Sequence, residues 1–194
     1  RGIGIPSFKS GYKHEIRLRI TKKSLLNQFQ RIRFHKPGQV NGVQADGVHG
    51  ERPILYATDP DSLRISQYHY QVWNDPPPSL VQRRALQLFD ARNIAPLVTN
   101  RLDPRIEAYR VSIRLNRFEV IRVDGVNREV VAGMRIRADF DGSRLPLMEK
   151  QYTLRRAAEG ESLTSGTAEL SVAVDEILLK FADDLVAADA ARRQ

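Results

Sequence analysis

Residues 68–79 read Tyr-His-Tyr-Gln-Val-Trp-Asn-Asp-Pro-Pro-Pro-Ser, and this stretch decides how we interpret the fold. Its first half is rich in aromatic residues, which is typical of a strand. The three prolines then end the strand, yet they suit the first turn of a helix, where a backbone N–H would have no partner. Apolar residues follow at helical spacing: Val81, Ala85, Leu88 and Phe89. We predict a strand over residues 63–72, a corner at Trp73 and a helix from Ser79 to Arg92.

The aromatic and proline residues of this corner have two interpretations. Amphipathic rings beside rigid prolines are common at interfaces, which makes the group a candidate partner-binding surface. Its members are Tyr68, Tyr70, Trp73, Pro76, Pro77 and Pro78. The alternative, which we favour for Trp73, is that the indole packs beneath the corner, since large aromatics are usually well buried. Both interpretations can hold together.

Upstream of the corner, the pattern predicts two further strands, a short helix and a loop. Residues 12–20 alternate apolar and charged side chains, as in a strand with one wet face. The first part of residues 22–34 has helical spacing, and we predict a short helix there. Residues 37–52 gather four glycines with Asn and Asp, so we expect a loop that projects from the fold. A strand over residues 54–57 and an Asp-Pro-Asp turn lead into the strand before the corner.

Downstream, the pattern predicts three antiparallel strands and a final helix. Residues 109–119, 130–138 and 148–154 alternate, and Asp-Gly turns separate them at positions 124 and 141. Helical spacing returns in one apolar stripe: Leu170, Val174, Ile177, Phe181, Leu185 and Ala188. Four acidic residues lie largely off this stripe, and we interpret them as a solvated face: Asp175, Glu176, Asp183 and Asp184. The fold class is therefore mixed α/β, with a largely antiparallel sheet and helices packed against it.

Length and composition predict one globular domain over residues 1–194, with residues 1–11 as an N-terminal arm. The chain has 41% hydrophobic and 28% charged residues, which excludes disorder, and it has no run long enough for a membrane-spanning helix. It contains no cysteine, which excludes thiolate nucleophiles and cysteine-ligated metals. We interpret the start at Arg1 as that of a processed or trimmed chain whose signal peptide and anchor would precede it.

All of the net charge of +8 lies in the N-terminal third, where residues 1–58 hold eleven lysines and arginines against three acidic residues. Basic residues near a tether would meet anionic headgroups, so we single out a candidate membrane-surface group. Its members are Lys9, Lys13, Arg17, Arg19, Lys22 and Lys23. The plainer interpretation is a solvated strand edge. A third interpretation is a nucleic-acid-binding module, which the neutral remainder of the chain does not favour.

The residues offer no constellation for catalysis. The four histidines are scattered, and no nucleotide-binding glycine loop, phosphate loop or nucleophile elbow is present. Neighbouring carboxylates on a helix diverge by about 100° and do not converge on one substrate. We therefore expect a protein that is not an enzyme and needs no metal or cofactor, with an enzyme on an unfamiliar scaffold as the remaining alternative.

Three stretches resemble the ABC-type transport auxiliary lipoprotein family, whose better-known branch is paraquat-inducible protein C. The first is Tyr-x-Tyr-x-x-Trp-x-x-Pro-Pro, from Tyr68 to Pro77; the second is the strand ending in Arg117-Phe118-Glu119; the third is the helix after Ser165. The resemblance covers roughly residues 54–188. The basic N-terminal segment departs from the family pattern.

The resemblance implies a non-catalytic, periplasmic lipoprotein tethered to the outer membrane. Such a protein would act as a binding or docking subunit of a transporter built from MCE-domain proteins, which moves lipids across the envelope. It would bind no cofactor and no nucleic acid, and it could form a homo-oligomer.

Overall fold

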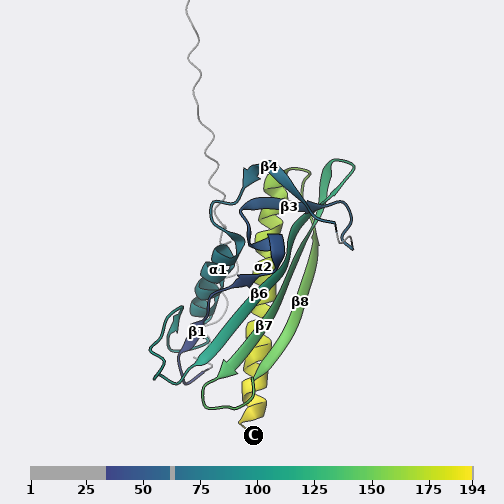
Figure 1. The fold of residues 1–194 in the computed structure, drawn as a ribbon. Coiled ribbons are helices and arrows are strands. Elements are labelled where there is room, and N and C mark those ends of the chain that lie inside the picture. The colour runs from purple at the N-terminus through teal and green to yellow at the C-terminus, as the bar shows by residue number, and fades with distance from the viewer. Residues whose placement is uncertain (1–33, 62–63, 194) are drawn as a thin grey trace, which may run out of the picture.

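The computed structural model describes residues 34–61 and 64–193 as two helices packed against a mixed eight-stranded sheet (Figure 1). The predicted α/β class is therefore confirmed. The strands are β1 (Gly38–Val40), β2 (Gln44–Ala45), β3 (Pro53–Ala57), β4 (Ser66–Val72), β5 (Val98–Thr99), β6 (Tyr109–Val123), β7 (Val126–Phe140) and β8 (Met148–Ala157). The helices are α1 (Pro77–Ala91), α2 (Leu163–Arg192) and the short 3-10 helix η2 (Gly47–Gly50).

The three longest strands, β6, β7 and β8, form an antiparallel meander, as the alternation predicts. Its first hairpin turns at Asp124 and Gly125, both of which have positive φ (50° and 81°), as a tight two-residue hairpin turn requires. Strands β6 and β7 are longer than the alternating stretches 109–119 and 130–138, because their pairing continues up to the turn. Two bulges interrupt the ladder between β6 and β7. At the first, Leu115 pairs with Met134 but Arg117 with Gly133, so that Asn116 is the extra residue. At the second, Ile121 pairs with Glu129 but Arg122 with Asn127, so that Arg128 is the extra residue.

The glycine-rich segment 37–52 does not project from the fold, and that prediction was wrong. Three short strands of residues 38–57 lie in succession along one edge of β6, all parallel to it: β1 beside Tyr109–Val111, β2 beside Arg114 and Leu115, and β3 beside Glu119–Ile121. The segment is in effect one long strand broken twice. Each piece is too short to show alternation, while pairing with β6 and burial of Val40 and His49 hold the pieces in place.

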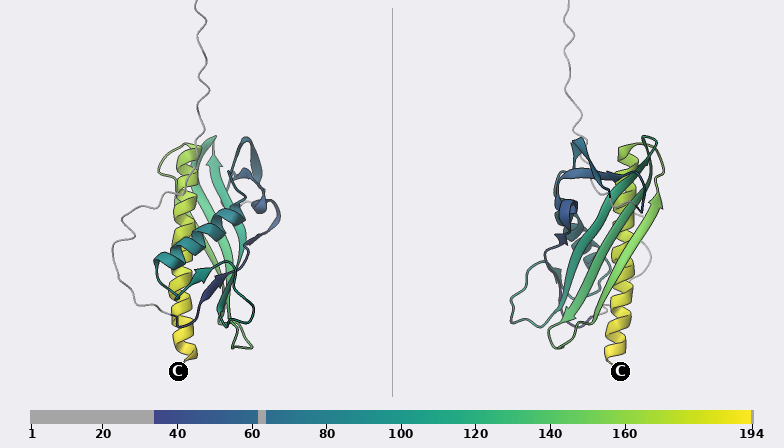
Figure 2. Two further views of the ribbon diagram at one scale, coloured as in Figure 1. Left: turned by 90° about the vertical axis from the view of Figure 1, so that its left-hand side faces the viewer. Right: turned by 45° about the vertical axis from the view of Figure 1, so that its right-hand side comes forward.

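Both helices cover the same face of the sheet (Figure 2). Helix α2 runs along β6–β8 and buries the predicted stripe, except that Ala188 is only half-buried. Ser162 caps its first turn by accepting a hydrogen bond from the backbone N–H of Ser165 (3.0 Å). Helix α1 starts at Pro77, two residues before the predicted Ser79, with no side-chain cap. Asp75 instead pairs with Arg83 at 2.8 Å.

The acidic residues of α2 are not simply a solvated face. Asp175 forms an ion pair with the buried Arg84 and so joins α2 to α1. Glu176 pairs with Arg156 of β8, and Asp184 accepts hydrogen bonds from two side chains of β8. These carboxylates fasten the helix to its neighbours, which the sequence pattern does not reveal because their partners lie far away in the chain.

Candidate functional site

The indole of Trp73 is the anchor of the corner between β4 and α1, as predicted. It is only 5% exposed and packs against Phe118 of β6, with ring centroids 5.2 Å apart. Its backbone N–H donates to the carbonyl of Arg52 (2.8 Å), and the Arg52 guanidinium donates back to the Trp73 carbonyl (3.1 Å). The corner is therefore held by packing and by hydrogen bonds to the start of β3.

The other aromatic and proline residues of the candidate surface divide into a packed group and an exposed group. The Tyr68 ring lies 4.9 Å from that of Tyr56, and its hydroxyl donates to Oδ1 of Asn127 (2.9 Å). Burial raises the pKa of the Tyr68 hydroxyl, which keeps it a neutral donor. Pro77 is buried, Pro78 is half-buried and Pro76 is exposed.

Tyr70 is the member that faces outward, with 92% of its surface exposed. Val72, two residues further on the same strand, is also exposed. Strand β4 pairs with β3 alone among the described strands, so its other edge carries unpaired backbone groups. The candidate partner-binding surface therefore consists of two parts. Residues around Trp73 are buried, and Tyr70 lies on an exposed strand edge.

The Arg117-Phe118-Glu119 motif supports the same corner from within. Phe118 packs on Trp73, while the buried Glu119 carboxylate accepts hydrogen bonds from the Arg117 side chain and from the backbone N–H of Phe118 (2.7 Å). Burial raises the pKa of Glu119, against the pull of Arg117. Nδ1 of the buried His49 lies 3.9 Å from this carboxylate, and burial together with the Arg117 charge lowers the pKa of His49. The motif builds a packed polar core at the bulge, away from the exposed strand edge.

All three stretches that carry the family resemblance meet at this end of the molecule. Asn127, the acceptor of the Tyr68 hydroxyl, also donates to the carbonyl of Glu161 just before α2 (3.2 Å). In α2 itself, Gly166 lies so close to Val120 that a Cβ there would sit 3.4 Å from its methyl groups. The motifs therefore describe one packed corner, of which β4 is the exposed margin.

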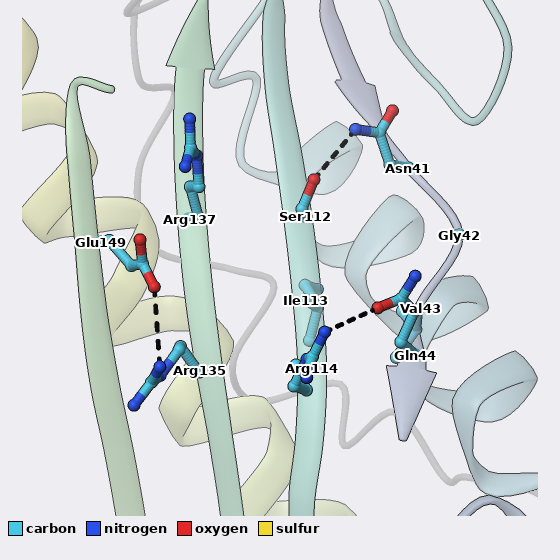
Figure 3. A pocket seen from close by; sticks show the side chains of 10 residues that line it. All are labelled: Asn41, Gly42, Val43, Gln44, Ser112, Ile113, Arg114, Arg135, Arg137 and Glu149. Atoms are coloured by element: carbon cyan, nitrogen blue, oxygen red, sulfur yellow. Dashed lines mark hydrogen bonds and ion pairs between the residues drawn. The ribbon is translucent and has the colours of Figure 1, made fainter. Parts of the chain in front are cut away.

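A second feature, which the sequence analysis did not single out, is a groove on the face of the sheet that the helices leave open (Figure 3). It has a volume of about 740 Å³ and lies between the β1–β2 segment and strands β6 to β8. It is lined by Asn41, Gly42, Val43, Gln44, Ser112, Ile113, Arg114, Arg135, Arg137 and Glu149. The alternation of β6 and β7 carries the signal for it, because these arginines all fall on the polar face of their strands.

Several sequence predictions fall outside what the structure can place. The candidate membrane-surface residues, from Lys9 to Lys23, and the predicted strand and helix around them lie outside the described residues. Within the described ranges, no helix has the length and apolar character to span a membrane, and no three His, Asp or Glu side chains gather as a metal site would require.

The fold is found in other proteins of known structure. A Xanthomonas campestris protein of family DUF330 superposes with a TM-score of 0.69 at 13% identity, over 84% of this chain and 90% of that one. An uncharacterised protein gives 0.66 at 12% identity, over 82% and 96%. A hypothetical protein from Chlamydia trachomatis gives 0.52 at 7% identity, over 80% and 99%. No family model and no curated protein matches the sequence. At such low identity these likenesses show a shared fold alone.

Proposed function

We propose that this chain is a non-catalytic accessory subunit of an MCE-type lipid transport system, located in the periplasm and tethered to the outer membrane. The observation that carries the proposal is the exposed edge of β4 beside the buried Trp73 corner. The sequence motif of the resemblance builds a rigid corner and, on its margin, displays a nearly fully exposed tyrosine. A rigid support under an exposed aromatic residue is what a docking surface needs.

Strand addition is the mode of docking that fits β4. An open strand edge offers backbone N–H and C=O groups to an extended segment of a partner, and the neighbouring side chains provide selectivity. Tyr70 and Val72 would contact the partner, because both are exposed on this strand. Trp73 would hold the strand in place without touching the partner.

The experiment is a binding measurement between the purified chain and the purified MCE-domain protein of the same genome. We expect saturable binding that Tyr70→Ala weakens by about tenfold or more, the loss of one aromatic anchor. Leu145→Ala is the matched control, since Leu145 is a large apolar side chain that is 75% exposed in the β7–β8 connection. Absence of binding, or equal losses in both variants, would contradict the proposal.

The basic N-terminal residues belong to the same proposal as a membrane-facing segment. Each lysine or arginine near an anionic surface contributes about 1 kcal/mol, and 1 M salt shortens the screening length to about 3 Å. We therefore expect the chain to co-sediment with anionic vesicles at low salt, and a form lacking residues 1–23 not to do so. Equal sedimentation of the two forms would contradict membrane binding by these basic residues.

A further inference from the structure

We propose that the groove on the helix-free face of the sheet binds a phosphate monoester, held between Arg114 of β6 and Arg135 of β7. Nothing in the proposed docking function requires this site, and the two proposals stand independently. The inference begins with the strand register. Arg114 pairs directly with Arg135, and the same row continues to Gln44 on one side and Gln151 on the other. Two arginines thus occupy directly opposite positions on neighbouring strands, with a side-chain amide at each end of the row.

This juxtaposition is unfavourable without an anion. Like charges directly opposite each other on neighbouring strands are destabilising, and departures from such local rules concentrate at functional sites. Figure 3 shows the two side chains turned away from each other, Arg114 toward Gln44 and Arg135 toward Glu149. The groove lies over this row.

The carboxylates nearby neutralise the two arginines only loosely. Arg114 has Asp46 at 3.5 Å and Arg135 has Glu149 at 4.0 Å, and all four side chains are well exposed to water. Exposed pairs at such distances contribute little. Two other arginines of this face are held more firmly, and the first is Arg137, which makes three hydrogen bonds of 2.7–3.0 Å to Asp139. The same is true of Arg110, which donates to Asp141 at 2.7 Å. Arg114 and Arg135 are therefore the pair that is available to a ligand.

The chemistry of the lining selects a phosphate group. A guanidinium presents a planar fork of N–H donors that matches two phosphate oxygens, and a monoester with three terminal oxygens can engage two forks at once. Neutral polar groups complete the groove, with Ser112 accepting a hydrogen bond from the Asn41 amide (3.0 Å). The volume is within the usual range for small-molecule sites. A groove bounded by the β1–β2 segment favours one headgroup over an extended polyanion.

The test is titration of the full chain, followed by the NMR signals of the arginine Nε–H groups and by calorimetry. The probes are sn-glycerol 3-phosphate, dihexanoyl phosphatidic acid and, as a zwitterionic comparison, dihexanoyl phosphatidylcholine. We expect both monoesters to shift the Arg114 and Arg135 signals and the phosphatidylcholine to leave them unchanged. Equal affinities would support the site with the phosphate group alone as ligand, and tighter binding of the lipid would support it with a contribution from the acyl chains.

Matched variants make the result decisive. Arg114→Gln and Arg135→Gln should each weaken monoester binding by about tenfold or more, because each removes one charged fork. Arg155→Gln makes the same change on the same face of β8, outside the groove, and should have no effect. Because the unliganded pair is repulsive, the two groove variants should also melt no lower than the parent chain without ligand. The absence of monoester binding, equal losses in all three variants, or a single-stranded oligonucleotide that binds the groove and resists competition by the monoester would overturn the proposal.

Discussion

Trp73 anchors the corner, because its ring is buried in the core and packs on Phe118 of β6. Trp73→Ala removes a large buried side chain and should lower the free energy of unfolding by about 3–5 kcal/mol. Tyr70→Ala on the same strand should change it by less than about 0.5 kcal/mol, since that side chain is solvated. Urea denaturation followed by circular dichroism measures both. A Trp73→Ala protein as stable as the parent would mean that the indole is a contact residue and not an anchor.

Asp184 gives the molecule a pH-dependent fastening between α2 and β8. A hydrogen bond from Lys150 (2.7 Å), with another from Tyr152 (2.8 Å), holds the pKa of Asp184 below its usual value. A carboxyl whose pKa is lowered by folding adds stability above its unfolded pKa of about 4, and this contribution is lost as the pH falls through the lowered value. Asp184→Asn should therefore cost about 1–2 kcal/mol at neutral pH and progressively less in acid. A difference between the two proteins that does not change with pH would refute the ionic origin.

The sequence predicts the buried residues of this end of the molecule better than their partners. Trp73 and the stripe of α2 follow from residue type and spacing alone. The polar partners do not follow from the sequence, because they come from distant elements. Tyr68 donates to Asn127, Tyr152 donates to Asp184, and Asp175 pairs with Arg84. Local patterns indicate which face is wet, but only the tertiary fold decides which wet residues pair.

At the scale of elements, the β6–β7 hairpin depends on the absence of a side chain at Gly133. A Cβ at this position would lie 2.7 Å from Oδ1 of Asn116 and 2.9 Å from Cβ of Arg117, the two residues that meet it at the bulge. Gly133→Ala should therefore destabilise the protein by about 1–3 kcal/mol. Gly42→Ala is the control, since a Cβ there has nothing within 4 Å. Equal melting temperatures for the two variants would show that the bulge adapts to a side chain.

Strands that pair with a neighbour in sequence could be predicted, and strands that pair over a long sequence distance could not. The meander follows from alternation and Asp-Gly turns, because antiparallel neighbours are also neighbours in sequence. The parallel pairing of β1, β2 and β3 with β6 joins residues 64 to 71 positions apart and leaves no local trace. The arginine row of the groove shares this origin, since Gln44, Arg114 and Arg135 meet only through that register.

At the scale of the whole molecule, the two proposed binding surfaces lie apart, one on a strand edge and one on the open face of the sheet. The edge of β4, beside the Trp73 corner, would receive a protein partner, and the helix-free face would receive a phosphate group. The shared fold of the Xanthomonas campestris protein, over 90% of its length, means that both surfaces can be sought on the same framework elsewhere. The homo-oligomer and the membrane tether stay predictions.

The most direct test of the docking proposal is photo-crosslinking in cells of the source organism, with a benzophenone amino acid placed at position 70 and, as the control, at position 145. Both positions are highly exposed, but only the first lies on β4. We expect a crosslink from position 70 to an MCE-domain protein, identified by mass spectrometry, and none from position 145. Equal crosslinking from the two positions, or no MCE-domain adduct from position 70, would contradict the docking proposal.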